Sequence, residues 1–495
     1  MEDPYEQPPQ NNIPVEVEKK INPKINELEI PCEGCGDNLC DVKCLECNKY
    51  FCSQCNKIIH SVKLYQSHKL TQLGNNLNKT TYEEKTIDRQ YQGPLETNIQ
   101  PSTKPTTEIK QSTQQPLQKV ESGMGIVLDQ GSYMVKVGIG GEDAPREVFP
   151  TIVGRPKPNL SIQMKDCYIG DDAFAKRGIL RLRRPIEHGN VVNWEDMESL
   201  WHHTFYNELK IDPEEHPILL SLKYNPENKN HPEKIAQIMF ETFNVPAFYI
   251  TQPELLSILA SGRLTGTVVD IGGQQTTVDS FYQAASLPGS RTRLDMGGAS
   301  ITDYFLKILA ERGYSFTTSA EREIVRDMKE KLCYTALDYK EEMRVASQST
   351  RFEKNYELPD GQMILIGNER FRATETLLQP HLLGSSMPGL INTIYQSISS
   401  CDFNYRNNLY QNIILSGGSS MFQGLAQRIQ KEISKLAPQK ATVKVIAPPE
   451  RKYSTWIGGS ILASLSSFQQ AWLTKENYNQ EGVSIVHKPS NLQLM

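Results

Sequence analysis

The chain of 495 residues has no apolar run close to the roughly 18 residues of a membrane-spanning helix. Its first residues also lack the basic and then apolar order of a secretory leader, so we expect a protein of the cytoplasm or, as an alternative, the nucleus. Basic residues are not in excess, and the formal net charge of -5 argues against direct binding to nucleic acid. With 38% hydrophobic residues, the chain can still build at least one large core.

Cysteine is scarce outside one short segment, in which seven of the ten cysteines lie. In a reducing compartment such clustering favours metal binding over disulfides. Eight candidate ligands follow one another as Cys32-x2-Cys35-x8-Cys44-x2-Cys47-x4-Cys52-x2-Cys55-x4-His60-x7-His68, and Cys40 falls outside the series. Eight ligands fill two tetrahedral zinc ions and leave no open position, which predicts structural zinc. The alternative is a group of free cysteines without metal.

Changes in residue composition and hydrophobic patterning divide the chain into four parts. Residues 1–28 are rich in Pro, Asn, Gln and Glu and predict a disordered tail, and residues 29–75 hold the zinc series. Residues 76–122 carry six basic and six acidic side chains without apolar periodicity, which predicts a flexible linker. From residue 123 to residue 495, strand-like and helix-like segments alternate and predict one large α/β unit. Amphipathic helices are expected over residues 301–312, 319–337, 389–399 and 424–436.

Two acidic, glycine-bearing turns contain the candidate ligand-binding residues of the large unit: Asp129-Gln-Gly-Ser-Tyr-Met-Val-Lys136 and Asp270-Ile-Gly-Gly-Gln-Gln-Thr-Thr277. Each follows an apolar run and precedes a second strand, so a duplicated strand-turn-strand unit is predicted. Glycines let backbone N–H groups approach phosphate oxygens, Ser132 adds a hydroxyl and Lys136 adds a positive charge. Asp129 and Asp270 would hold a hydrated divalent cation between them. The alternative is a pair of ordinary structural hairpins.

The large unit contains longer characteristic blocks, among them Asp143-Ala-Pro-Arg146, Lys176-Arg-Gly-Ile-Leu180, Pro185-Ile-Glu-His-Gly189, Glu311-Arg-Gly-Tyr-Ser-Phe-Thr-Thr318 and Trp456-Ile-Gly-Gly-Ser-Ile-Leu-Ala-Ser-Leu465. Through these blocks, residues 125–487 resemble actin and the actin-related proteins. Sugar kinases share the paired turns but not these blocks.

The zinc series resembles the B-box zinc finger. This resemblance implies one ion on Cys32, Cys35, Cys52 and Cys55, a second on Cys44, Cys47, His60 and His68, and a role in recruiting protein partners.

The resemblance to actin implies a fold of four subdomains with ATP or ADP and Mg²⁺ or Ca²⁺ in a central cleft. Both acidic turns would contact the phosphates, a helix near residue 329 would reach the ribose and base, and two later segments would flank the adenine. The nucleotide-binding residues implied are Asp129, Gly131, Ser132, Tyr133, Lys136, Asp270, Gly272, Gly273, Lys329, Glu330, Gly417, Gly418, Ser419, Met421 and Lys452.

Four departures from the actin pattern concern the chemistry of the cleft. Where the family has a glutamine and a histidine that position the hydrolytic water, this chain has Pro253 and Thr277. Proline has no side-chain donor or acceptor, and threonine has one hydroxyl on a shorter arm than imidazole, so we expect weak or absent hydrolysis. Gly273 replaces an aspartate near the cation, and Tyr133 replaces a glycine beside the phosphates, a change that we expect the site to tolerate.

Other departures concern assembly. Residues 157–164 form a shorter loop than the one that docks actin subunits, and residues 382–390 and 488–495 also differ, so we expect no homopolymer. Leu462 and Leu465 keep the apolar character of the cleft through which actin binds partner helices, with a core helix as the alternative interpretation. The sequence therefore predicts a cytoskeletal scaffold, possible partners being actin or cytoskeletal complexes. Two alternatives are a polymerising, ATP-hydrolysing actin and a nuclear subunit of a chromatin-remodelling complex.

Overall fold

The computed structural model describes residues 42–44, 49–51, 70–72, 123–157, 165–223 and 230–487. Three short antiparallel strands, β1 (Val42–Cys44), β2 (Lys49–Phe51) and β3 (Leu70–Gln72), pair in the order β2-β1-β3. Of the eight candidate zinc ligands only Cys44 belongs to a described strand, and the other seven lie outside the described residues, as do the predicted tail and linker. Within the described ranges, no helix is long and apolar enough to cross a membrane.

The first large sheet contains the first acidic turn. Its strand order is β22-β13-β12-β4-β5-β6, in which β4 and β5 form an antiparallel hairpin while β4, β12 and β13 run parallel. All four residues of β12 are buried, as expected for a parallel strand covered on both faces. The strands are β4 (Ile126–Gln130), β5 (Met134–Ile139), β6 (Glu147–Pro150), β12 (Ile218–Ser221), β13 (Ala247–Thr251) and β22 (Leu473–Thr474).

The second large sheet repeats this arrangement around the second acidic turn. Its order is β16-β15-β14-β20-β21, with β17 paired to β15; β14 and β15 form the antiparallel hairpin, and β14, β20 and β21 run parallel. Each sheet has a hydrophobic core of its own. The strands are β14 (Gly266–Ile271), β15 (Thr276–Tyr282), β16 (Ala285–Ser286), β17 (Thr292–Leu294), β20 (Ile413–Ser416) and β21 (Val445–Ile446).

The registers of the two hairpins coincide. Asp129 pairs with Lys136 across the first hairpin and with Ser221 on the parallel neighbour. Asp270 pairs in the same way with Thr277 and with Ser416. The predicted duplicated strand-turn-strand unit is therefore present, and both aspartates lie at the carboxyl ends of parallel strands, the edge where open α/β sheets bind ligands.

Helices surround the two sheets, and the four helices predicted from the sequence lie close to their expected ranges. α7, α11 and α13 agree with the expected ranges to within three residues at either end. α8 begins as expected, with a capping box between Thr318 and Glu321, but ends at Leu332 instead of residue 337, because the chain becomes extended at Cys333 and Tyr334 bridges to Gln423. The helices are α3 (Gly170–Ala175), α4 (Trp194–His202), α5 (His231–Gln237), α6 (Pro253–Ala260), α7 (Gly298–Glu311), α8 (Ser319–Leu332), α9 (Tyr339–Ala346), α10 (Glu369–Glu375), α11 (Leu390–Ser400), α12 (Phe403–Gln411), α13 (Leu425–Leu436), α14 (Ser454–Ser464) and α15 (Lys475–Glu481).

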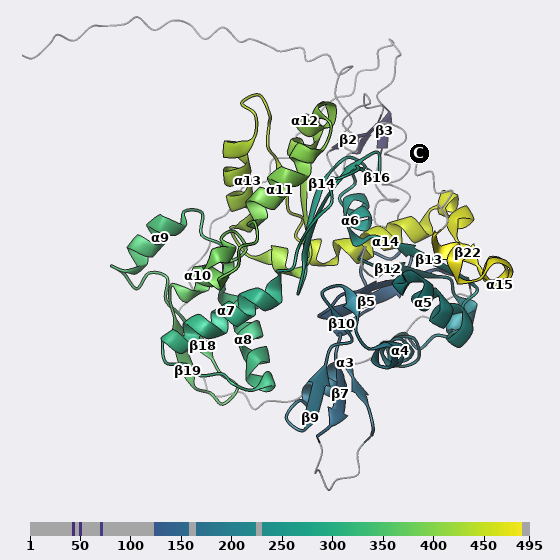
Figure 1. Cartoon of the computed structure of the whole chain (residues 1–495), viewed down its shortest axis with the longest axis horizontal. Coiled ribbons are helices and arrows are strands. Elements are labelled where there is room, and N and C mark those ends of the chain that lie inside the picture. The colour runs from purple at the N-terminus through teal and green to yellow at the C-terminus, as the bar shows by residue number, and fades with distance from the viewer. Residues whose placement is uncertain are drawn as a thin grey trace, which may run out of the picture.

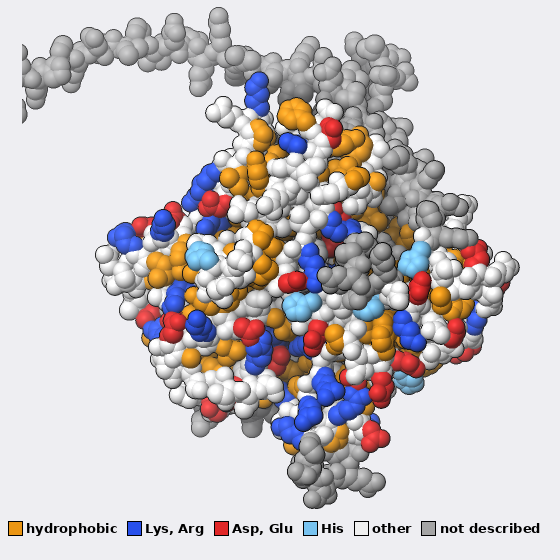
Figure 2. Space-filling model, viewed as in Figure 1, with side chains coloured by type: hydrophobic (Ala, Val, Ile, Leu, Met, Phe, Trp, Pro, Cys, Tyr) orange, Lys and Arg blue, Asp and Glu red, His pale blue; other side chains and the backbone are white. Residues whose placement is uncertain are grey.

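Two smaller parts complete the molecule (Figure 1). The sheet of β7 (Val153–Pro156), β8 (Tyr168–Ile169) and β9 (Leu180–Arg183) projects from the first large sheet, and the hairpin of β18 (Lys354–Glu357) and β19 (Met363–Ile366) lies beside α7, α8 and α10. A further short hairpin joins β10 (Ile186–Glu187) and β11 (Asn190–Val191). Along β9 leucines alternate with exposed arginines, and Figure 2 shows basic side chains gathered over this end.

Two crossing helices join the halves. α14 packs on β4 and β12 of the first sheet, α6 packs on β14 and β15 of the second, and the two helices pack on each other. At the crossing, a Cβ on Gly458 would lie 1.8 Å from the backbone oxygen of Leu256, so only glycine fits there. The Trp456 indole donates to the Val127 carbonyl at 3.1 Å, which fixes α14 to β4.

Candidate functional site

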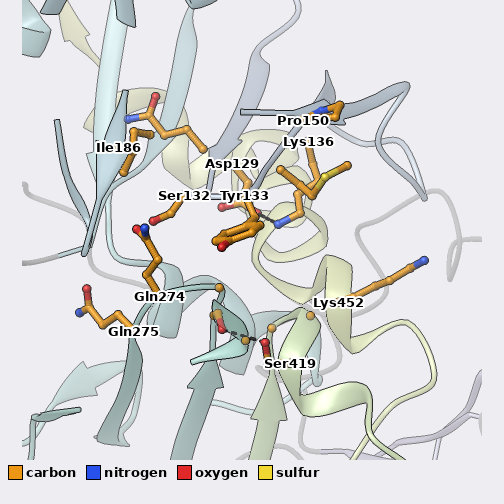
Figure 3. Close-up of a pocket in the computed structure, with 18 of the residues that line it drawn as sticks. Asp129, Ser132, Tyr133, Lys136, Pro150, Ile186, Gln274, Gln275, Ser419 and Lys452 are labelled. Atoms are coloured by element: carbon orange, nitrogen blue, oxygen red, sulfur yellow. Dashed lines mark hydrogen bonds and ion pairs between the residues drawn. The ribbon is translucent and has the colours of Figure 1, made fainter. Parts of the chain in front are cut away.

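The two acidic turns face a single cavity of about 800 Å³ between the two sheets. Figure 3 shows Ser132, Tyr133 and Lys136 on one side of this cavity and Gln274 and Ser419 on the other. Every residue that the sequence predicted around a nucleotide lines this cavity: Asp129, Gly131, Ser132, Tyr133, Lys136, Asp270, Gly272, Gly273, Lys329, Glu330, Gly417, Gly418, Ser419, Met421 and Lys452. Residues up to 323 positions apart in the sequence, from Asp129 to Lys452, thus meet at one site.

The carboxylate of the first turn is fully engaged. The Lys136 ammonium lies 2.8 Å from Asp129 Oδ2, and the Ser221 hydroxyl donates to Asp129 Oδ1 at 2.7 Å. The register explains these contacts, because both partners lie directly opposite Asp129 on the neighbouring strands. Asp129 is therefore held as a buried, hydrogen-bonded carboxylate with an ammonium of its own.

The carboxylate of the second turn has an ammonium too. Lys223, two residues beyond the end of β12, places its Nζ atom 2.6 Å from Asp270 Oδ2. The other carboxylate oxygen lies close to the backbone at Gly417. A Cβ on Gly417 would lie 2.7 Å from Asp270 Oδ1. Gly417 also has a φ of +87°, which favours glycine. The Ser419 hydroxyl, which follows, donates to the Gly272 carbonyl at 2.8 Å and fixes the turn.

The position of the Tyr133 ring accounts for the glycine at position 273. The ring of Tyr133 reaches from the first turn to the second, where a Cβ on Gly273 would lie 2.3 Å from the ring atom Cδ2. An aspartate at position 273 would clash with this ring, so the loss of the aspartate and the gain of the tyrosine form one structural feature. Sequence reasoning treated them as two independent departures.

The Arg184 guanidinium also packs against the Tyr133 ring. The guanidinium lies 3.8 Å from the ring centroid and donates to the Ser132 and Tyr133 carbonyls at 3.2 and 3.3 Å. It also pairs with Glu323 of α8 at 3.4 Å. Burial lowers the pKa of Arg184, but an arginine remains charged at any physiological pH. The first turn, α8 and the second turn are thus connected through one stacked ring.

The residues at and beside the positions expected to orient a hydrolytic water have other roles in the fold. The Thr277 hydroxyl donates to the carboxylate of Glu254, which is 2% exposed and whose pKa is raised by burial. Pro253 is the first residue of α6, where its missing N–H costs nothing. Gln252 accepts a hydrogen bond from Arg291, a side chain that also pairs with the fully buried Asp279. Gln252 therefore cannot replace the missing glutamine without breaking this network.

The opposite wall of the cavity comes from α8 and the segments after β20 and β21. Lys329 is buried and donates to the Gly298 carbonyl and the Thr302 hydroxyl at 3.0 and 3.1 Å, and burial lowers its pKa. Glu330 pairs with Arg326 at 2.9 Å. In Figure 3 the side chain of Lys452 extends away from the first acidic turn. A ligand would thus meet backbone and apolar surface here more than free charge.

A divalent cation bridging Asp129 and Asp270 does not fit the donor set. Three of the four carboxylate oxygens have partners. Lys136 and Ser221 contact the two oxygens of Asp129, and Lys223 contacts Oδ2 of Asp270. Each of the two carboxylates that would hold the hydrated cation thus has an ammonium group beside it. Among the described residues, no group of three or more His, Cys, Asp or Glu side chains could hold a metal.

The apolar cleft expected at Leu462 and Leu465 is not open in this structure. The two side chains are 0% and 7% exposed and pack with Trp456, Phe468 and Trp472 in one core cluster. The described residues therefore support the alternative interpretation of α14 as a core helix. Of the three segments expected to weaken assembly, residues 158–164 and 488–495 lie outside the described residues, while Leu382, Leu383 and Met387 pack against the core of the second sheet.

Sequence reasoning missed Lys223, Glu254 and Arg184. A signal existed for Lys223, because it follows a buried strand at the edge where parallel strands carry ligand-binding residues. Glu254 falls in the first turn of α6, where an acidic residue is usual and gives no sign of burial beside Thr277. Arg184 lies in a run of arginines whose contact with Tyr133 depends on tertiary structure alone.

Comparison with protein families gives one match over this part of the chain. A family model described as Actin matches residues 120–491, which is more than half of the chain. The match includes both large sheets and every residue that lines the cavity, and it begins after the zinc series ends.

Proposed function

This chain belongs to the actin family, and on that basis we propose that its central cavity binds ATP or ADP and hydrolyses the nucleotide weakly or not at all. One observation carries the proposal: all fifteen residues implied by the family pattern line the same cavity, with the two acidic turns facing each other. Backbone N–H groups at glycine turns, the Ser132 hydroxyl and the Lys136 ammonium are suited to phosphate oxygens. The bound nucleotide would stabilise the closed cavity by mass action.

Blocking the cavity at Gly418 tests nucleotide binding. A Cβ at Gly418 meets nothing within 4 Å and the backbone is unstrained, so Gly418→Phe projects a ring into the cavity without disturbing the fold. We expect affinity for a fluorescent ADP analogue to fall about 10- to 100-fold, the effect of overfilling a packed site. Gly178→Phe is the matched control, because Gly178 also has open space around its Cβ and does not line the cavity.

Equilibrium titration of the purified full chain measures this effect. If the wild-type chain binds neither ATP nor ADP, or if both substitutions change the affinity equally, the cavity is not a nucleotide site. Unchanged thermal unfolding of nucleotide-free Gly418→Phe would show that the fold tolerates the ring.

We further propose that residues 29–75 form a B-box-type module with two zinc ions, which recruits a protein partner to a cytoskeletal scaffold. The ligand spacing supports this proposal, since eight Cys and His residues in paired order match two closed tetrahedral sites. A segment of this length buries too little apolar surface to fold alone, so the metal would supply most of its folding free energy.

Metal analysis of the protein purified without chelator is expected to give about two zinc ions per chain, the number that eight ligands fill. Cys52→Ser removes one ligand and should lower the content to about one ion, since three protein ligands hold zinc less tightly. Cys40→Ser is the matched control, because Cys40 stands outside the ligand series. A zinc content near zero in the wild-type chain would overturn the module. Affinity purification with and without residues 1–122 would then separate its partners from those of the actin-like part.

A further inference from the structure

We infer that the Lys223 ammonium takes the place of the divalent cation in this cavity, so that the protein binds a nucleoside polyphosphate without a metal ion. The inference rests on the nucleotide site proposed above and names how that site balances charge. It is carried by the position of Lys223 between the two acidic turns.

Lys223 lines the cavity that the two acidic turns face. It leaves the carboxyl end of β12 next to Ser221, the residue that donates to Asp129, and its Nζ atom reaches Asp270 across the cavity at 2.6 Å. A Cβ on Gly272 of the second turn would lie 3.4 Å from the same Nζ atom. The ammonium therefore lies beside the Asp270 carboxylate and close to Gly272, at the end of the strand that neighbours Asp129.

The ammonium is charged and has hydrogen atoms to offer. The Lys223 ammonium pairs with the Asp270 carboxylate, and the carboxylates of Glu254 and Asp129 add to the negative charge around it. The Nζ atom is buried, and its 2.6 Å contact with Asp270 Oδ2 leaves two of its three hydrogen atoms without an acceptor among the described residues. Such a donor at the rim of a phosphate turn is suited to a phosphate oxygen.

The charge balance argues against an added cation. Each aspartate already faces one ammonium, Lys136 for Asp129 and Lys223 for Asp270. A divalent ion would have to enter beside both ammonium groups and displace at least one of them. An incoming polyphosphate instead meets two ammonium groups, which compensate its charge as a metal ion would.

The experiment compares the affinity of the full chain for a fluorescent ADP analogue with and without added Mg²⁺. Metal-depleted buffer replaces a chelator, because a chelator would also remove zinc. We expect the dissociation constant of the wild-type chain to change less than threefold on adding Mg²⁺. Lys223→Met should weaken binding in metal-free buffer about 10- to 100-fold, the worth of a charged hydrogen bond, and added Mg²⁺ should restore part of the loss.

Two variants serve as controls. Lys223→Arg keeps the charge and should keep binding independent of Mg²⁺. Lys331→Met, at the rim of the same cavity where Lys331 pairs with Asp327, should leave the response to Mg²⁺ unchanged.

Three results bear on the inference in different ways. Wild-type affinity that rises tenfold or more with Mg²⁺ would overturn it while leaving the nucleotide site intact. Metal-independent binding that survives in Lys223→Met would overturn the role of Lys223. Absence of binding in both buffers would overturn the proposed function itself.

Discussion

Phosphate release from the ATP-loaded full chain is expected to be at least about 100-fold slower than from a polymerising actin assayed beside it, the contribution of a positioned proton-transfer group. Phosphoryl transfer depends on placing the attacking water, and the residues at and beside the two positions expected to do so either lack a polar side chain or are held by other contacts. Pro253 has no polar side-chain atom, the Thr277 hydroxyl donates to Glu254, and the Gln252 amide is held by Arg291.

A phosphate-release assay on purified protein measures this rate, and the Gly418→Phe variant gives the background of any contaminating ATPase. High-speed pelleting of the same samples reports filaments. Release at the rate of actin together with pelleting would contradict the proposal and would favour the alternative of a polymerising, ATP-hydrolysing actin. Slow release without pelleting leaves the scaffold as the function, and nuclear import would then favour the chromatin-remodelling alternative.

Gly273→Asp is expected to destabilise the fold in the wild-type background and to be nearly neutral when Tyr133 is replaced by glycine. In the wild-type chain the new Cβ would lie 2.3 Å from the Tyr133 ring, which the Arg184 guanidinium also contacts. Overpacking of this kind costs about 1–3 kcal/mol. Removing the ring first opens the space, so the two changes should show a coupling energy of about 1–3 kcal/mol.

Denaturant unfolding of the wild-type chain, the two single variants and the double variant completes the cycle. Gly178→Asp is the control for adding a carboxylate at a glycine with open space around it. Additive effects of the two substitutions would mean that Tyr133 and Gly273 do not depend on each other.

The hairpins and their duplication were predictable because they rest on local patterns. Apolar runs on either side of an acidic, glycine-bearing turn predict strand, turn and strand wherever they occur, and β4, β5, β14 and β15 follow them closely. The residues that the family resemblance implied around a nucleotide all line one cavity, and their contact with a nucleotide stays a prediction.

What the sequence could not predict are contacts between distant residues. Tyr133 and Gly273 are far apart in the chain, and nothing in either turn alone shows that a ring from one lies against the other. The same holds for Lys223, whose neighbourhood contains three carboxylates from three different strands or helices. The end of α8 was also missed, because helix propensity continues past Leu332 while the backbone is drawn into a bridge with Gln423.

The crossing of α6 and α14 limits how the molecule can move. With no room for a side chain between Gly458 and the Leu256 carbonyl, the two helices cannot slide past each other without a clash. Any relative motion of the two sheets is then a rotation about this fixed pivot, and displacement grows with distance from it. The Tyr133 ring, which lies against Gly273 of the other half, is a contact that such a rotation would open or close.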